Sequence, residues 1–283
     1  MSDAQTVYLN GAFLPIEEAH VPVLDRGFIF GDGIYEVVPV YGGRPFRLPH
    51  HLRRLARSLA AIGIDNPLDD AGWGELVAGL VSRHPWPDQF IYMQVTRGVA
   101  RRDHAFPKAA TPTVFAMASP FVAPAPELRE QGLSVITRAD DRWLHCDIKS
   151  ISLLGNVLAK QEAVEAGAAE SVMFRDGMLT EGASSNIWLV RDGRVLGAPT
   201  DHLVLEGIRV GLVGELCQMQ GIACELRRIT REEVFAADEL MLTSATREIL
   251  PITRIDGQPV GDGRPGPIYK RLFEAYQAAK LAA

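Results

Sequence analysis

The sequence predicts an α+β fold with a small N-terminal domain and a larger C-terminal domain, each containing helices and strands. The chain has 283 residues, of which 47% are hydrophobic, enough to build a substantial core. Hairpin signals and helical patterns are mixed instead of alternating strictly, which disfavours a doubly wound parallel sheet. The stretch SPFVAPAP, residues 119–126, has three prolines, which disfavour both a regular helix and the hydrogen-bond ladder of a strand. We therefore expect domains at 1–118 and 127–283, joined by a linker at 119–126.

Two hairpins are predicted near the N-terminus. TVYL and AFL flank Asn10-Gly11, a pair that suits a two-residue turn, and IYEVVPVY returns at Gly42-Gly43 through PFRL. Apolar residues then recur at helical spacing between residues 52 and 62, which predicts an amphipathic helix. The rest of this domain reads as a helix over about 70–82, the strands FIYMQVTR and TVFAMA, and a polar loop at 97–112 between them.

The C-terminal domain alternates less regularly between strands and helices. Asp176-Gly177, Asp192-Gly193 and Asp256-Gly257 mark three hairpin turns. The other predicted elements are the strands LSVITR, ACELRR and ELMLTS, the helices SLLGNVLAKQEAVEAG and IRVGLVGELCQMQ, a short helix, and a closing amphipathic helix.

Composition excludes several classes of partner. Lys and Arg number 29 against 35 Asp and Glu, a net charge of −6 that disfavours nucleic acids and membrane surfaces. No apolar run approaches the roughly 20 residues of a membrane span, and MSDAQTVYLN lacks the features of a signal peptide, so we expect a cytoplasmic protein. Three cysteines without a CxxC pair indicate reduced thiols and no metal site. Small molecules are the expected ligands.

Nucleotide cofactors find no support in the sequence. Gly31-Asp32-Gly33 begins like a dinucleotide fingerprint, but Glu36 stands where the third glycine belongs, and no P-loop pattern occurs.

Lys149 is the candidate for amine chemistry. The chain has only five lysines, and this one follows Trp143, Cys146 and Ile148 and precedes ISLLGN, an apolar setting. Burial disfavours the charged form of a lysine and makes the neutral amine available as a nucleophile and base. The alternative is an interfacial lysine whose amine reaches water.

Three further segments could hold a planar, anionic ligand. In TEGASSN, small residues would let the ligand approach while Glu181 contacts a ring nitrogen, although such a run is also an ordinary turn. Gly207 precedes a helical pattern, so free N–H groups could meet an anion there. Arg54 could add a guanidinium fork to a phosphate, or lie on a solvated helix face.

A fourth group of side chains suits a carboxylate. Tyr35 in GDGIYE and the loop with Arg101, Arg102 and His104 combine a guanidinium with hydrogen-bond donors. A solvated basic loop is the alternative.

Taken together, these segments resemble the class IV, or fold-type IV, aminotransferases that use pyridoxal 5'-phosphate, and among them the D-amino acid (D-alanine) aminotransferases. The resemblance extends over nearly the whole chain. It rests on the order of DRGFIFGDGIYEVV, HHLRRLARS, YMQVTRG, RRDHAFP, DIKSISLLGNVLAKQEA, TEGASSN, LEGI and DELMLTSATREI.

The resemblance implies how the cofactor is held. Lys149 would form the Schiff base, Glu181 would pair with the pyridine nitrogen, and Leu205 would pack against the ring. The residues that correspond to the phosphate grip are Arg54, Gly207, Ile208, Arg209, Ser244 and Ala245.

The substrate site is implied in the same way. Tyr35, Arg102 and His104 match the trap for the substrate α-carboxylate, and in the D-amino acid enzymes the loop bearing the last two comes from the neighbouring subunit. The resemblance therefore implies a homodimer with shared active sites. A shift of one residue in this loop would exchange the roles of Arg101 and Arg102.

The sequence departs from the D-alanine enzymes at two phosphate positions. Arg209 stands where those enzymes usually carry a hydroxyl, and Ala245 also lacks one. Backbone N–H groups could still bind the phosphate, and Arg209 would either add a charge or point to solvent.

The implied function is ping-pong transamination between D-amino acids, such as D-alanine and D-glutamate, and 2-oxo acids. The alternatives within the same fold are a branched-chain L-amino acid aminotransferase, whose carboxylate site would lie near Ser244 and Ala245, and aminodeoxychorismate lyase. A non-catalytic scaffold is a further alternative, against which the presence of Lys149 and Glu181 argues.

Overall fold

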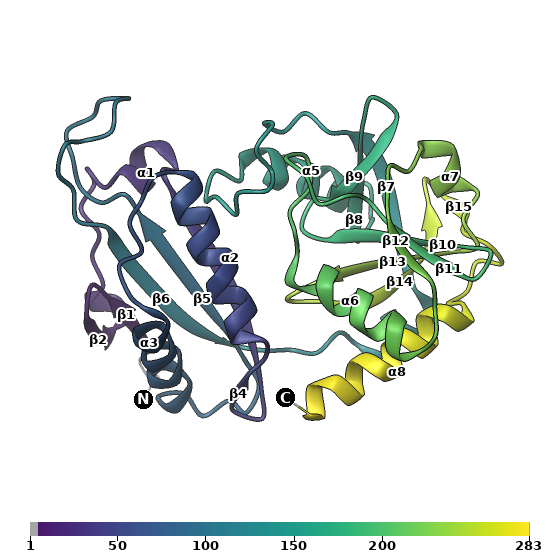
Figure 1. Cartoon of the computed structure of the whole chain (residues 1–283), viewed down its shortest axis with the longest axis horizontal. Coiled ribbons are helices and arrows are strands. Elements are labelled where there is room, and N and C mark those ends of the chain that lie inside the picture. The colour runs from purple at the N-terminus through teal and green to yellow at the C-terminus, as the bar shows by residue number, and fades with distance from the viewer. Residues whose placement is uncertain (1–4, 283) are drawn as a thin grey trace. The chain divides into compact units, whose positions relative to one another are not determined.

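The computed structural model describes residues 5–282 and divides the chain into two compact units (Figure 1). The first contains the chain up to Val122 together with Ile148–Ser152, and the second contains Ala123–Asp147 and the chain from Leu153 onward. Both units combine helices with a β-sheet, so the predicted α+β class is confirmed. Within residues 5–282, none of the helices has the length and apolar composition needed to cross a bilayer.

The segment around Lys149 is where the expected domain boundaries and the structure differ. We expected this lysine in the C-terminal domain, but residues 148–152 pack with the first unit. Ser150 forms a β-bridge with Ile34, and the Tyr35 N–H donates to the Lys149 carbonyl at 3.0 Å. Backbone pairing with a strand far away in sequence thus decides where Lys149 lies, and no local pattern encodes that pairing.

The first unit is built on a six-stranded antiparallel sheet in the order β2-β1-β6-β5-β3-β4. Both predicted hairpins are confirmed, with positive φ angles at Asn10, Gly11, Gly42 and Gly43. The strands are β1 (Thr6–Leu9), β2 (Ala12–Pro15), β3 (Gly33–Tyr41), β4 (Arg44–Pro45), β5 (Gln89–Thr96) and β6 (Thr113–Pro120).

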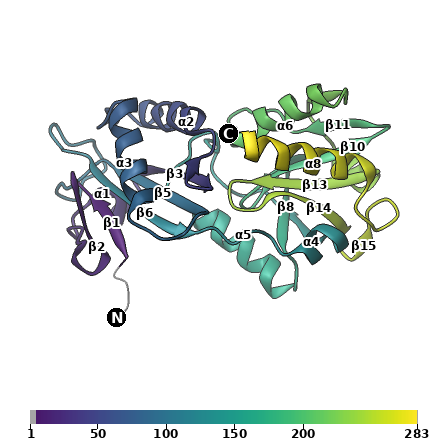
Figure 2. The ribbon, with the colours of Figure 1, turned by 90° about the horizontal axis from the view of Figure 1, so that it is seen from below.

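Helices α2 (Leu48–Ala61) and α3 (Asp70–Ser82) cover this sheet and bury its core (Figure 2). Leu55 of α2 and Trp73 of α3 pack with Val38 of β3 and Ile91 of β5, all fully buried. The odd positions of β3 are less buried than the even ones, so Glu36 shares the helix-covered face while Tyr35 lies on the opposite face. Two short segments were not predicted, a 3-10 turn at Ile16–Glu18 and α1 (Arg26–Phe30).

The second unit is built on a nine-stranded sheet that is mostly antiparallel. Its order is β12-β11-β10-β13-β14-β7-β8-β9, with β15 paired to β14, and β7 runs parallel to both of its neighbours. The strands are β7 (Leu133–Ala139), β8 (Glu170–Arg175), β9 (Met178–Gly182), β10 (Asn186–Arg191), β11 (Arg194–Gly197), β12 (Cys224–Leu226), β13 (Glu239–Ser244), β14 (Glu248–Ile255) and β15 (Gln258–Pro259).

Several helices accompany this sheet. Helices α6 and α8 lie side by side in both views and contact β13 (Figures 1 and 2), while α5 contacts β7 and β8. The three predicted Asp-Gly turns are confirmed, since each has positive φ angles at both residues. The helices are α4 (Pro126–Gln131), α5 (Leu154–Glu165), α6 (Ile208–Met219), α7 (Arg231–Phe235) and α8 (Pro267–Ala282).

Two glycines in α3 should respond in opposite ways to alanine. A Cβ at Gly74 meets no atom within 4 Å, so Gly74→Ala should stabilise the protein by about 0.5–1 kcal/mol through helix propensity. A Cβ at Gly79 would lie 2.4 Å from Cζ of Phe13, so Gly79→Ala should destabilise by about 1–3 kcal/mol. Urea denaturation of both variants measures this, and equal stabilisation by both would contradict the packing of Phe13 on α3.

Candidate active site

Lys149 lies beside Tyr35 in the first unit. Its Nζ lies 4.1 Å from the centroid of the Tyr35 ring, and the Ser58 hydroxyl accepts a hydrogen bond from the Lys149 N–H at 3.3 Å. The lysine is half-buried, in keeping with the apolar setting expected from its neighbours. Two residues of the predicted site, Lys149 and Tyr35, are therefore brought together by the pairing of their backbones.

Arg54 is fixed by a carboxylate that the sequence analysis did not assign to the site. Glu36 on β3 is fully buried and accepts hydrogen bonds from Arg54 Nε at 2.6 Å and Nη2 at 2.8 Å. His51 Nδ1 lies 2.8 Å from the same carboxylate. Burial raises the pKa of Glu36, but the charges and hydrogen bonds of Arg54 and His51 outweigh it and hold the pKa far below its ordinary value.

A signal for Glu36 was present in the sequence. In the alternating strand IYEVV it falls on the same face as Ile34 and Val38, where a carboxylate must find a cationic partner. Arg54 is only 6% exposed, so the solvated alternative for this residue is wrong.

Arg102 and His104 lie on the exposed loop between β5 and β6, still within the first unit. Both contact the ring of Phe30 in α1, with Arg102 Cζ at 5.4 Å from its centroid and the His104 ring at 5.5 Å. Among the described residues, neither side chain forms a hydrogen bond or ion pair with Tyr35. Within the described residues, the three side chains of the predicted trap are therefore not joined to one another by hydrogen bonds.

Glu181 is the centre of a buried polar cluster in the second unit. Its Oε1 accepts a hydrogen bond from Arg142 Nη1 at 2.6 Å. Arg142 also donates two hydrogen bonds of 2.9 Å to the Asp140 carboxylate. Its Oε2 accepts from the Leu205 N–H at 3.2 Å and from Asn186 Nδ2 at 3.3 Å. Both carboxylate oxygens are thus fixed in position.

Burial dominates the electrostatics of this cluster. Desolvation raises the pKa of Glu181 to about 7, although Arg142 and the Leu205 N–H act in the opposite direction. The Asp140 side chain is also buried, but the hydrogen bonds and charge of Arg142 and the hydrogen bond from Thr180 outweigh desolvation and lower the pKa of Asp140 to about 2. Glu181 is therefore a carboxyl that can gain or lose a proton near neutral pH. Sequence reasoning missed Arg142, Asp140 and Asn186, because their roles depend on contacts across the sheet.

Gly207 is the N-cap of α6, and no side chain of the described chain caps that helix start. A Cβ at Gly207 would lie 2.1 Å from Asn186 Oδ1, so only glycine allows this approach. Asn186 Nδ2 also donates to the Leu205 carbonyl at 3.0 Å. One amide thereby links Glu181, Leu205 and the first turn of α6, whose Ile208 is the first helical residue.

The other predicted phosphate residues are divided between two places in the second unit. Arg209 is 2% exposed, and its guanidinium lies 5.6 Å from the Tyr276 ring of α8, so the expectation that it might point to solvent is excluded. Ser244 ends β13, and its hydroxyl accepts from the Arg247 N–H at 3.0 Å. Ala245 follows in the same turn.

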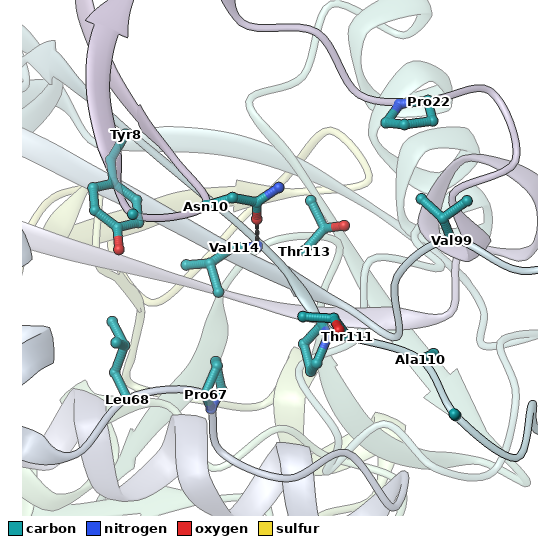
Figure 3. A pocket seen from close by; sticks show the side chains of 13 residues that line it. Tyr8, Asn10, Pro22, Pro67, Leu68, Val99, Ala110, Thr111, Thr113 and Val114 are labelled. Carbon is teal, nitrogen blue, oxygen red and sulfur yellow. Dashed lines mark hydrogen bonds between the residues drawn. The ribbon is translucent and has the colours of Figure 1, made fainter.

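A separate pocket of about 840 Å³ opens in the first unit (Figure 3). Pro22, Pro67, Leu68 and the loop 109–112 line it, and the Asn10 carboxamide at its wall accepts from the Val114 N–H at 2.9 Å. None of the predicted site residues of this unit lines it. Within residues 5–282 no group of three or more His, Cys, Asp or Glu side chains is arranged to hold a metal ion.

The sequence was compared with protein families and with known proteins. Residues 33–255 match the profile of amino-transferase class IV. The chain belongs to the class IV aminotransferase family. This confirms the resemblance drawn from the motifs and identifies the protein as an enzyme of that class.

Two D-alanine aminotransferases are similar to this class IV aminotransferase over nearly its full length. The Bacillus licheniformis enzyme is 42% identical over 276 residues, which cover 98% of this chain and 97% of that one. The Staphylococcus epidermidis enzyme is 40% identical over 272 residues, which cover 96% of each chain.

Solved structures of this class IV aminotransferase's relatives show the same fold. A branched-chain amino acid aminotransferase of Thermoproteus uzoniensis, solved with norvaline, has a TM-score of 0.90 at 28% identity and covers 98% of this chain and 94% of its own. A fold IV-transaminase of Curtobacterium pusillum has a TM-score of 0.83 at 26% identity, covering 96% and 93%. The predicted fold-type IV architecture is confirmed.

The raised pKa of Glu181 predicts a specific pH dependence of stability. In the unfolded chain this carboxyl ionises above its ordinary value of 4.5, whereas in the folded chain it ionises only near 7. Unfolding therefore releases a proton between these values, and the contribution of Glu181 to the free energy of unfolding falls as pH rises.

Glu181→Gln lacks this titration, so its stability relative to the wild type should increase between pH 5 and 7 and level off above. Chemical denaturation of the cofactor-free proteins across this range measures the difference. A difference that is constant with pH would show that Arg142 keeps Glu181 ionised throughout.

Proposed function

We propose that this enzyme transfers the amino group of D-amino acids, such as D-alanine and D-glutamate, to 2-oxo acids. The observation that carries the proposal is the 42% identity with a D-alanine aminotransferase across nearly the whole length of both chains. The structures of branched-chain enzymes resemble this fold closely, but at 28% identity or less among those compared, so they support the L-specific alternative less well. Tyr35, Arg102 and His104 supply the groups expected for a carboxylate trap.

Pyridoxal 5'-phosphate fits the residues of each unit. Lys149 offers an amine in the first unit, and Glu181 offers a carboxyl fixed at both oxygens in the second. Gly207, the N-cap of α6, has no side chain to cap the helix, so the N–H groups of its first turn suit an anion such as the phosphate. The residues that would hold the cofactor are Lys149, Glu181, Arg54, Leu205, Gly207, Ile208, Arg209, Ser244 and Ala245.

When bound, the cofactor supplies an electron sink for the bonds at the substrate Cα. Lys149 then acts as base and acid, taking the Cα proton and returning it on the path to the 2-oxo acid. Glu181 holds a proton at the ring nitrogen, and Arg142 and Asn186 keep its carboxylate in place. The Tyr35 ring face lies 4.1 Å from Lys149 Nζ and borders the space in which this amine acts.

Arg102 and His104 hold the substrate α-carboxylate, which fixes the Cα–H bond that faces the base. Both residues lie against Phe30 and neither is hydrogen-bonded to Tyr35 within the described chain, and we infer that they serve a second copy in a homodimer with shared active sites. Exposed apolar side chains of the loop and of α1 suit such an interface, among them Phe28 at 76% and Phe106 at 62% exposure.

We also place the reaction in the cytoplasm, where cysteines such as the three free ones here stay reduced.

The half-reaction tests the proposed function. D-Alanine added without an acceptor should convert the absorbance of the cofactor-loaded protein to that of the pyridoxamine form, and L-leucine should not. Lys149→Ala should abolish sustained turnover, because it lacks the amine that moves the proton.

Other outcomes identify the alternatives. Conversion by L-leucine alone would indicate a branched-chain enzyme and contradict the assignment of Arg102 and His104. Pyruvate release from aminodeoxychorismate without an amino acceptor would indicate the lyase. A protein that cannot be loaded with pyridoxal 5'-phosphate would support a non-catalytic scaffold.

Arg102→Ala should reduce the transition-state stabilisation for D-alanine by about 2–4 kcal/mol, because the substrate carboxylate loses its charged partner. The ratio kcat/KM measures this loss. Arg101→Ala is the matched control, since Arg101 is the adjacent residue and its side chain is also exposed. A large loss in the control with none in Arg102→Ala would assign the trap to Arg101.

A further inference from the structure

The motif DRGFIFGDG contains charged residues that the proposed reaction does not use. Its central part forms α1, which begins after Asp25 and ends at Gly31 in the left-handed region, with φ of 66°. The Asp25 side chain caps the helix by accepting from the Gly27 N–H at 2.8 Å. Arg26, the first residue of α1, is only 3% exposed despite its charge, so it must have buried partners.

Asp32, just after α1, joins two of these charges. Its Oδ2 accepts from Arg26 Nε at 2.7 Å and from Arg97 Nε at 2.8 Å, and its Oδ1 accepts from Arg97 Nη2 at 3.0 Å. Burial raises the pKa of Asp32, but the hydrogen bonds and charges of Arg97 and Arg26 outweigh it and lower the pKa below its ordinary value. This carboxylate is therefore ionised at neutral pH and holds both guanidinium groups.

The far side of Arg26 reaches the substrate loop. Its Nη1 donates to the carbonyl oxygens of Asp103 at 2.6 Å and Ala105 at 3.4 Å, the two residues that flank His104. Its guanidinium also lies 4.8 Å from the centroid of Phe30, the ring that Arg102 and His104 contact. Arg26 therefore fixes the backbone on both sides of His104.

Arg97 anchors the other end of the same loop. Its Cζ lies 3.6 Å from the centroid of the Phe106 ring, and its Nη groups donate to the carbonyls of Ile62 at 2.6 Å and Gly63 at 3.0 Å, just beyond α2. The loop is thus tied through one carboxylate to the C-terminal end of a core helix.

We propose that Arg26, Asp32 and Arg97 form a brace that positions Arg102 and His104 to bind the substrate α-carboxylate. An exposed loop that orders only on binding loses conformational entropy, and a loop ordered in advance avoids this cost. The Arg26 guanidinium is already occupied by Asp32 and by the carbonyls of Asp103 and Ala105, whereas Arg102 forms no ion pair within the described chain and is left to meet the substrate. This proposal rests on the proposed function. It attributes part of the enzyme's affinity for the substrate to DRGFIFGDG, a motif that does not itself contact the substrate.

Arg26→Lys tests the brace in the cofactor-loaded enzyme. Lysine keeps the charge, but one ammonium cannot reproduce the planar fork that joins Asp32 to the Asp103 carbonyl. The KM for D-alanine and the Kd for propanoate, a carboxylate without an amine, should rise about tenfold, the size of effect expected when one hydrogen bond to a charged group is lost. The kcat and the affinity of the apoenzyme for pyridoxal 5'-phosphate should stay within about threefold of the wild type, because the brace touches neither Lys149 nor Glu181.

Two further variants separate positioning from general stability. Arg129→Lys is the matched control, since Arg129 also pairs with a buried carboxylate, Glu248 at 3.2 Å, and lies 4.9 Å from a phenylalanine ring, Phe273. It should leave the Kd for propanoate unchanged. Phe30→Leu removes the ring that Arg102 and His104 contact, and the position is partly exposed. This variant should weaken propanoate binding, and it provides a test even if Arg26→Lys does not fold.

An unchanged Kd for propanoate in Arg26→Lys, or in Phe30→Leu where the first variant does not fold, would overturn the brace. An equal loss of affinity for pyridoxal 5'-phosphate would also overturn it, because the effect would then be on the whole unit. Wild-type protein that binds no pyridoxal 5'-phosphate, or that binds it without responding to D-alanine, would instead refute the proposed function.

Discussion

A carboxylate can be buried in a protein only where a cation or several hydrogen-bond donors replace the water it loses, and this constraint organises both units. Glu36 is paired with Arg54, Asp32 with Arg26 and Arg97, and Glu181 with Arg142. Arg54, Arg97 and Arg142 come from elements 18, 65 and 39 residues away from their carboxylates, whereas Arg26 lies six residues before Asp32. Removing one partner of a pair would leave an uncompensated charge. The backbone on both sides of His104 is held by one of these pairs through Arg26, whereas the position of Lys149 follows from the backbone pairing of its segment with β3.

All the cations in these pairs are arginines, in a chain that has 24 arginines and five lysines. A guanidinium remains charged and presents donors in a planar fork, so it can hold a carboxylate and a carbonyl at once, as Arg26 does with Asp32 and Asp103. An ammonium group is a compact point charge without such a fork, so it holds a carboxylate with less geometric specificity.

Local chemistry made most of the fold predictable, whereas pairing across the chain did not. Asn-Gly and Asp-Gly turns with positive φ angles located the hairpins, and apolar spacing located α2 and α3. Helix α1 has five residues, too few to show a period, and the placement of Lys149 in the first unit depends on the bridge between Ser150 and Ile34. Of the candidate site, Lys149 and Glu181 were identifiable from their neighbours and motifs. Arg142 was not, because a guanidinium becomes part of a site only through the fold that brings its carboxylate close.

The electrostatics of Glu181 link this constraint to the proposed chemistry. A fully desolvated carboxylate alone would favour its neutral form strongly, and an exposed ion pair with arginine would keep it ionised at all physiological pH values. Burial and Arg142 oppose each other here, and the resulting pKa of about 7 leaves the proton easy to share with a basic ring nitrogen. A carboxyl beside the ring nitrogen of pyridoxal 5'-phosphate would keep that nitrogen protonated, which would strengthen the ring as an electron sink. The asymmetric surroundings of Glu181, with Arg142 on one oxygen and an amide and a backbone N–H on the other, are therefore suited to proton sharing as well as to anchoring.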